Sequence, residues 1–406
     1  MTTDSTLLAN FEDWVSKEIP NFNNAIEMGS KQSEDLMAAL HPWVHRLHAE
    51  ISPGSILQKE ARKAIQLIGF AVSSLERHYQ SEKLQVGTAI LRLGVVNELL
   101  SDLSITAKHP PRDTHYTYWL WNNGQRPLTF TGDDQEIFFN RVVNRTHELH
   151  EDSCQNLRPL CLGELDLRST EAALAVTASS DNTLELYERF RSFMAKDETH
   201  DRRMMEPQFF MTRMRTYLPT YPINGVTWAG VNAANLAAQM QLDYLVGVVL
   251  PEYNVTVRGR LPYLTEEDRK NLEVDMVIPS LSDRLIEELA LTRESLEFLD
   301  VSDLANYIFT QSVDIQRILF SYKKLVQANA KLSAIHWALI QNYLVKAAAD
   351  LTAEEKAKLS VAPDRGTGGK THAQTQAIMR MRKEHPIFGK LTAAIDIVEK
   401  AIPVYA

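Results

Sequence analysis

Apolar residues recur at intervals of three and four along most of this chain, a spacing that places them on one face of an α-helix. Glycine and proline, the residues that most often interrupt helices, number only 16 each among 406 residues. Helix-start signals agree with this pattern. Thr265 is followed three residues later by Asp268, and Thr352 by Glu355, which is the spacing of a capping box. We therefore predict an all-α fold.

Two features divide this helical chain. Paired prolines at Pro110 and Pro111 end a helix, and an aromatic-rich run over residues 115–121 leads into a turn. We predict a smaller helical domain over residues 1–128 and a larger one over residues 129–406, with a site where they meet. Residues 253–264 alternate in type around Gly259 and predict a small β-hairpin.

Charge and cysteine content exclude several classes of protein. A formal net charge of -9 disfavours nucleic acid or an anionic membrane as the main partner. No stretch approaches the roughly 20 apolar residues of a membrane-spanning helix, and the N-terminus lacks the layout of a secretory signal. Cys154 and Cys161 alone cannot form a disulfide framework or a four-cysteine metal site. We expect a cytoplasmic enzyme.

His336 lies in a sequence with helical spacing and an apolar face. The residues one and two turns away that share this face are Leu332, Leu339, Ile340 and Tyr343. A neutral imidazole facing an apolar cavity can bind a heme iron as its single protein ligand. The alternative is a buried histidine whose imidazole is satisfied by a backbone carbonyl.

Two further segments could bind an anion. The loop Gly366, Thr367, Gly368 and Gly369 would let backbone amides approach a carboxylate closely, although a surface linker would look the same. Arg215 lies five residues after Phe210 in an otherwise apolar helix. Its guanidinium could hold a carboxylate through two hydrogen bonds, or form an ion pair with a nearby acidic residue.

Two histidine clusters offer a different chemistry. One contains His41, His45 and His48, and the other contains His147 and His150 beside three acidic residues. Such sets could bind zinc or a pair of irons in a helix bundle. The Glu-x-x-His pattern of a di-iron bundle is missing here, so we interpret both clusters as solvated helix faces.

Taken together, these segments resemble the superfamily of indoleamine and tryptophan dioxygenases, and within it the monodechloroaminopyrrolnitrin synthases. Their order along the chain carries the resemblance, which runs from about residue 65 to about residue 385. The matching segments are residues 68–70 with 74–78, 110–113 with 121–122, 207–218 with 229–234, and His336 with residues 366–369.

The resemblance implies a two-domain helical fold whose larger domain holds heme b, bound without a covalent link and capped on its distal side by the smaller domain. The proximal heme ligand of the family matches His336, and the glycine loop beside the propionates and substrate matches residues 366–369. The arginine that binds the substrate carboxylate matches Arg215. The aromatic residue of the distal pocket matches Phe138.

Three positions depart from the dioxygenase pattern. Val142 stands where the family has a small hydroxyl residue, Asn232 replaces a serine, and Val231 replaces a glycine. We therefore expect a heme-dependent oxygenase or oxidase that uses O2 or peroxide on a tryptophan-like or other aromatic amino acid, with an altered outcome. The alternatives are a non-heme di-iron oxygenase and a non-catalytic helical binding protein. A homodimer is possible.

Overall fold

The computed structural model describes residues 3–51, 56–124, 127–357, 359, 372–384 and 386–402, and it is mainly α-helical, as predicted. The α-helices are α1 (Thr3–Glu27), α2 (Ser33–Glu50), α3 (Gln58–Ser81), α4 (Thr88–Leu93), α5 (Val96–Ala107), α6 (Asp134–Leu162), α7 (Thr170–Ser192), α8 (Ala237–Val246), α9 (Pro251–Arg258), α10 (Glu266–Asp275), α11 (Leu281–Glu288), α12 (Arg293–Phe298), α13 (Val301–Phe309), α14 (Val313–Ile340), α15 (Ala347–Ala349), α16 (Ala353–Ala357), α17 (His372–Glu384) and α18 (Pro386–Ala401).

Shorter elements join these helices. The π-helices are η1 (Tyr116–Leu120), η2 (Phe209–Met214) and η6 (Gln341–Lys346). The 3-10 helices are η3 (Arg215–Tyr217), η4 (Ala233–Asn235) and η5 (Leu261–Tyr263). Two antiparallel pairs provide the strands: β1 (Lys196–Asp197) with β2 (Arg202–Arg203), and β3 (Tyr221–Ile223) with β4 (Val226–Trp228).

The hairpin predicted over residues 253–264 is wrong, because this segment forms α9 and η5. Tyr253 and Val257 are both buried and lie four residues apart, so helical spacing outweighed the alternation of residue types. A hairpin forms instead at β3–β4, where Asn224 and Gly225 have φ values of 50° and 75°. Asn-Gly is the usual pair for such a turn, since both positions need positive φ.

One of the two predicted capping boxes is confirmed in full. At the start of α10, the Thr265 side chain accepts a hydrogen bond from the backbone N–H of Asp268, but the Thr265 N–H donates to the Tyr116 hydroxyl and not to Asp268. At the start of α16, the Thr352 hydroxyl accepts from the Glu355 N–H at 3.2 Å, and the Glu355 carboxylate accepts from the Thr352 N–H at 2.8 Å. Both threonines therefore lie at helix starts, as predicted.

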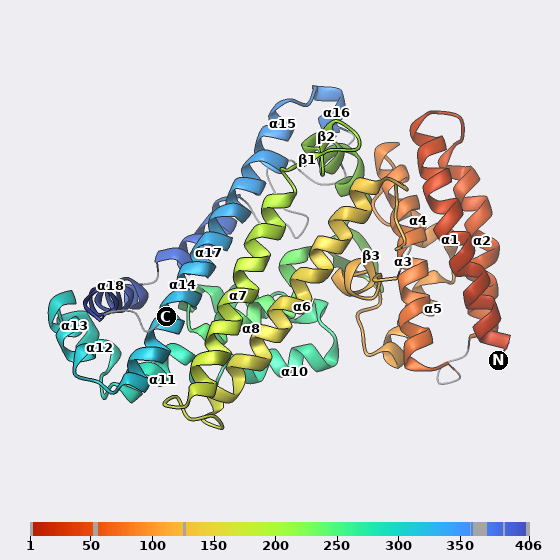
Figure 1. Cartoon of the computed structure of the whole chain (residues 1–406). Helices are drawn as coiled ribbons and strands as arrows, with labels where there is room; N and C mark the ends of the chain where they lie inside the picture. The colour runs from red at the N-terminus through yellow and green to blue at the C-terminus, as the bar shows by residue number, and fades with distance from the viewer. Residues whose placement is uncertain are drawn as a thin grey trace.

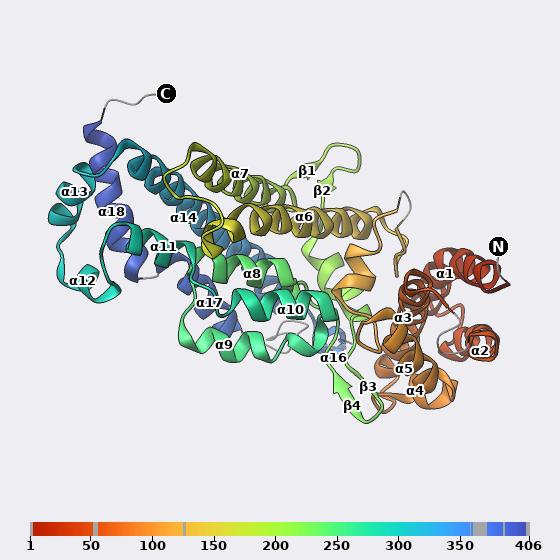
Figure 2. The same ribbon diagram turned by 90° about the horizontal axis from the view of Figure 1, so that it is seen from below.

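The helices form an elongated molecule (Figure 1). Helices α1 to α5 occupy one end, α6, α7 and α14 run through the middle, and α12, α13 and α18 occupy the other end. A second view shows the same arrangement, with α8, α9 and α10 covering one side of the middle group (Figure 2). Helix α7 packs against both α6 and α14.

The hydrophobic core of the N-terminal helices is shared with a distant part of the chain. Its buried side chains come mainly from α1 to α5 and η1, but residues after 200 also contribute: Tyr217, Leu218, Tyr221, Ile223, Val231 and Leu236. The chain therefore returns to the first helical group through η3 and β3–β4. This return places the segment after η2 at the junction between the two helical groups.

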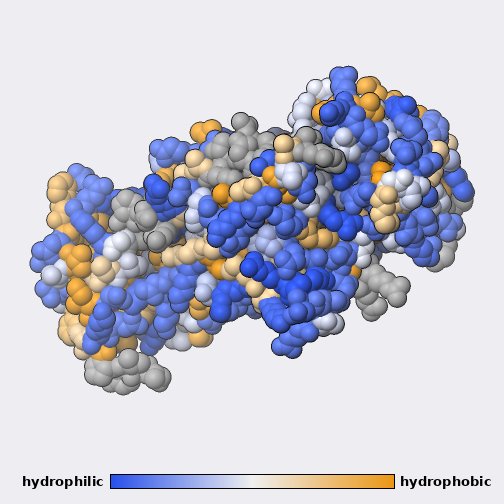
Figure 3. Space-filling view, turned by 90° about the horizontal axis from the view of Figure 1, so that it is seen from above, coloured by the Kyte–Doolittle hydropathy of each residue, from blue (hydrophilic) through white to orange (hydrophobic). Residues whose placement is uncertain are grey.

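The face of the molecule shown in Figure 3 is largely hydrophilic. Hydrophobic side chains gather at the end of the molecule formed by α12, α13 and α18, where Phe298, Phe309 and Val313 are exposed. Among the helices of the described residues, none combines the length and the apolar character needed to cross a membrane. The homodimer stays a prediction.

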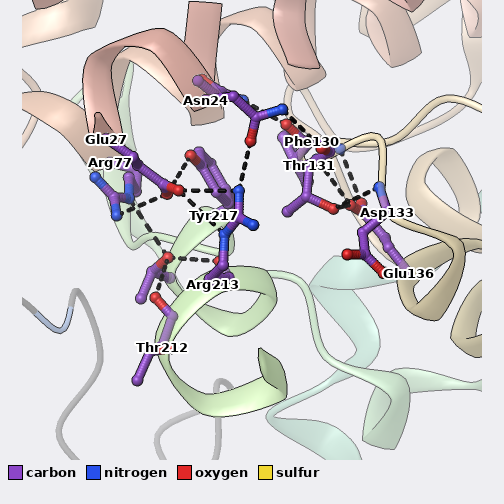
Figure 4. Close-up of polar contacts among 12 residues, drawn as sticks. Asn24, Glu27, Arg77, Phe130, Thr131, Asp133, Glu136, Thr212, Arg213 and Tyr217 are labelled. Carbon is purple, nitrogen blue, oxygen red and sulfur yellow. Dashed lines mark hydrogen bonds and ion pairs between the residues drawn. The ribbon is translucent and has the colours of Figure 1, made fainter. Parts of the chain in front are cut away.

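The carboxylate of Glu27 in α1 links the first helical group to the η2–η3 segment (Figure 4). Glu27 accepts a hydrogen bond from the Tyr217 hydroxyl at 2.7 Å and forms ion pairs with Arg77 and Arg213, both at 3.1 Å. The neighbouring Asn24 accepts from Arg213 and donates to the Thr131 carbonyl at 3.1 Å. Because these groups are largely shielded from water, they hold η2–η3 in a fixed position.

We predict that Glu27→Ala lowers the free energy of unfolding by about 1–3 kcal/mol, because two guanidinium groups and a phenol lose their acceptor. Urea denaturation followed by circular dichroism measures this loss. The matched control is Glu12→Ala, which removes a more exposed carboxylate on the same helix that pairs with Lys63. The control should change stability by less than about 1 kcal/mol. Equal effects of the two substitutions would contradict a special role for Glu27.

Candidate active site

A cavity lies between the middle helices and the segments that cross to the N-terminal group. The volume open to the centres of water-sized molecules is about 270 Å³. One water needs roughly 15 Å³ on this measure, so the cavity can hold a ligand of many atoms. Aromatic side chains from three elements form much of its wall: Phe139 of α6, Phe190 of α7, Phe193 just after α7 and Phe210 of η2.

His336 of α14 faces this cavity. The four residues predicted to share its face line the cavity with it: Leu332, Leu339, Ile340 and Tyr343. The Phe190 ring meets the imidazole edge-on, with 5.5 Å between ring centroids. Within the described ranges, no polar group makes a hydrogen bond to the ring of His336.

The protonation state of His336 follows from its surroundings. Burial among apolar side chains lowers the pKa of the imidazole to about 4, and the positive charge of Arg382 contributes to this lowering. At neutral pH the ring is therefore uncharged. A neutral imidazole keeps a nitrogen lone pair available for a metal ion held in the cavity.

Arg215 is buried and also lines the cavity. It lies five residues after Phe210, and a regular α-helix would separate their faces at this spacing. Here η2 is a π-helix, and the backbone N–H of Arg215 donates to the Phe210 carbonyl. The wider turn brings both side chains to the cavity, and Arg215 Nη1 also donates to Met211 Sδ at 3.3 Å.

Two residues that the resemblance assigns to the distal pocket do not line the cavity. Phe138 packs against Phe193 at an interplanar angle of 82°, and Val142 is buried beside it, but neither belongs to the cavity lining. Their chain neighbours Phe139 and Val143 line the cavity instead. The family positions thus fall one residue before the positions that face the cavity on α6.

The other two departures from the dioxygenase pattern, Asn232 and Val231, lie in different surroundings. Asn232 lines the cavity, and its side chain accepts a hydrogen bond from the Ala234 N–H at 2.9 Å. Val231 is buried in the core of the N-terminal helices and not in the cavity wall. The valine residues at 142 and 231 therefore do not narrow the cavity directly. Gly366, Thr367, Gly368 and Gly369 lie outside the described residues.

Charged side chains gather at another part of the cavity wall. Asp243 of α8 pairs with Arg382 of α17 through two hydrogen bonds of 2.9 and 2.7 Å. The Tyr253 hydroxyl donates to the same carboxylate at 2.7 Å, and the Gln239 amide oxygen, in its favourable orientation, accepts from Arg382 at 3.0 Å. Arg260, between α9 and η5, lines the cavity beside these groups.

Local sequence patterns did not point to these charged residues. Arg260 falls within the segment that was predicted to be a hairpin, so its approach to the cavity was overlooked. Asp243 offered a usable signal, because a single carboxylate in the apolar run of residues 236–246 is costly to bury unless a cation pairs with it. Its partner Arg382 lies 139 residues further along the chain.

The two histidine clusters differ in their surroundings. His41 and His45 are exposed, and His48 lies 3.4 Å from Glu98, so the first cluster is a solvated face as predicted. For the second cluster this interpretation is wrong, because His150 is buried and lines the cavity. In the part of the chain that the structure describes, no group of three or more histidine, cysteine or acidic side chains could hold a metal ion.

A scan against protein-family models and a search of curated proteins find nothing that matches this chain. The site therefore has to be interpreted from its own residues.

Because several histidines are buried, we predict that mild acid destabilises the protein. Burial lowers the pKa of four imidazoles outside the His336 helix: His78 to about 2, His109 and His150 to about 3, and His115 well below its usual value. The unfolded chain takes up these protons below about pH 6.5, whereas the folded chain does not. Their stabilising contribution is thus present above pH 6.5 and falls between pH 6.5 and about pH 3.

Each such histidine removes up to about 1.4 kcal/mol of stability per pH unit in that range. Urea denaturation at pH 8, 7, 6 and 5 should show this loss. His115→Phe removes one proton-binding ring from a site where neither ring nitrogen has a partner among the described residues. The free energy of unfolding of this variant should change less steeply with pH, because about one proton fewer is taken up on unfolding. An unchanged slope would contradict the assignment.

Proposed function

We propose that this protein is a heme-dependent oxygenase or oxidase that acts on an aromatic amino acid, and that His336 is the axial heme ligand. The observation that carries the proposal is the uncharged, cavity-facing imidazole of His336 without a hydrogen-bond partner among the described residues. His336 is partly exposed and its ring lines the cavity, so a ligand in the cavity can reach the imidazole. A heme iron would supply the partner that this imidazole lacks among the described residues.

The residues around His336 fit a heme. The walls are aromatic and aliphatic, as a porphyrin face requires, and Arg215 and Arg260 offer positive charge for propionate groups. The resemblance inferred from the sequence implies the same ligand. A heme bound by His336 would supply the activation of O2 or peroxide.

The chain itself would contribute binding and orientation. Arg215 would hold the carboxylate of the amino acid through its planar guanidinium, and the rings of Phe139 and Phe210 would pack on the aromatic side chain. The apolar wall would exclude water from the reacting groups. His150 does not act as an acid at neutral pH, because burial keeps its pKa at about 3.

The non-heme di-iron alternative has less support. It needs a cluster of histidine and carboxylate ligands, and the described residues contain no such cluster. A non-catalytic helical binding protein is compatible with the same cavity. A visible spectrum of the purified protein, before and after addition of hemin, separates these alternatives, because only bound heme gives an intense Soret band.

We predict that His336→Ala abolishes the Soret band that the wild-type protein develops with hemin, because the iron loses its only protein ligand. Titration with hemin followed by visible spectroscopy measures this. Added imidazole should restore the band by occupying the space left by the side chain. The matched control is His150→Ala, which removes the other cavity-lining histidine. If His150→Ala loses the band and His336→Ala keeps it, the ligand assignment is wrong.

We predict that Arg215→Leu weakens the binding of L-tryptophan or L-tyrosine by about 2–5 kcal/mol, while the heme spectrum stays intact. The substitution leaves a substrate carboxylate without its cation in a water-poor cavity. Spectral titration of the heme protein measures the affinity. Arg213→Leu is the control, since Arg213 belongs to the same segment but pairs with Glu27 outside the cavity. Equal binding of tryptamine and L-tryptophan to the wild type would refute this role.

A further inference from the structure

Among the described residues, the charges at the polar part of the cavity wall do not balance. Arg260 and Arg382 bring two positive charges to this region, and Asp243 brings one negative charge. Asp243 is already committed, because both of its oxygens accept hydrogen bonds from Arg382 and one also accepts from Tyr253. Among the described residues, no carboxylate lies within 4.0 Å of Arg260.

Arg260 is held in place despite this lack of a negative partner. Its Nη1 donates a hydrogen bond to the backbone carbonyl of Ala234 in η4, another cavity-lining residue. Burial lowers the pKa of the guanidinium, and the Arg382 charge adds to this effect, whereas Tyr253 and Asp243 oppose it. A guanidinium nevertheless stays charged at neutral pH.

A charged group removed from water is costly unless an opposite charge pairs with it. We propose that Arg260 binds a carboxylate of the ligand that occupies the cavity. A carboxylate fits better than a phosphate for two reasons. Its single negative charge matches the positive charge of Arg260, which no described carboxylate offsets, and its planar shape allows two parallel hydrogen bonds to a guanidinium.

Arg260 and Arg215 belong to different parts of the wall, so their guanidinium groups offer two separate places for a carboxylate. Arg215 comes from η3 and lies next to Met211, whereas Arg260 contacts η4 from the segment between α9 and η5. The source of the carboxylate rests on the proposed function. It is either a heme propionate or the carboxylate of the aromatic substrate, and the two sources can be tested separately.

The experiment uses the full chain with Arg260→Gln and Arg260→Lys. The matched control is Arg258→Gln, two residues away, where the side chain is exposed on α9. The first arm compares the binding of hemin with that of hemin dimethyl ester, which lacks both negative charges. The second arm compares L-tryptophan with tryptamine on the heme-loaded protein. The third arm uses heme-free protein and compares indole-3-acetate with indole-3-acetamide by calorimetry.

We expect Arg260→Gln to lower the affinity for the charged member of at least one pair by about ten- to a hundredfold, and to leave its neutral counterpart unchanged. Loss in the first arm identifies a propionate, and loss in the second arm identifies the substrate carboxylate. Arg260→Lys should show a smaller loss, because it keeps the charge but not the planar fork. Arg258→Gln should resemble the wild type.

Two results separate the inference from the proposed function. If the wild type binds no hemin, but binds indole-3-acetate in a manner that depends on Arg260, the function is wrong and the carboxylate site stands. If Arg260→Gln matches Arg258→Gln in every arm, the carboxylate site is refuted. Should Arg260→Gln fail to fold, equal affinity of the wild type for the charged and neutral members of all three pairs would refute it as well.

Discussion

The packing of α7 against α6 and α14 is the interaction on which the cavity depends. The first part of α7 buries small side chains, among them Ala172, Ala173, Ser179 and Ser180, and these allow neighbouring helices to approach closely. Large rings follow at Phe190 and Phe193, and both line the cavity. Small side chains of α7 therefore lie where the middle helices pack closely, and large rings at its end lie where the cavity begins.

Segments with charged side chains form part of the cavity wall, and shielding these charges from water costs free energy. Arg215, Arg260 and Arg382 all reach a wall that is otherwise rich in aromatic and aliphatic side chains. Asp243 offsets one of these charges within the protein. Aromatic walls together with buried guanidinium groups favour a ligand that is flat and apolar over most of its surface and anionic at its edge. Both heme and an aromatic amino acid have this character.

Much of the fold and part of the candidate site could be predicted from local signals. The N-cap at Thr265, the capping box at Thr352 and the apolar face around His336 depend on residues three and four positions apart, and all of them are present in the structure. The hairpin expected over residues 253–264 does not form, and this prediction also used local spacing alone. Alternation over a short segment cannot be told from helical spacing until burial decides which side chains face the core.

What the sequence alone determined is the helical character of the chain and the face on which His336 lies, because both follow from spacing within a single helix. Tertiary structure decided the rest of the site. Asp243 meets Arg382 across 139 residues, and Phe139 rather than Phe138 faces the cavity because the packing of α6 sets its rotation. A π-helix turns Arg215 inward, and the chain's return at Ala234 fixes Arg260. These contacts join distant segments, so only the folded chain defines them.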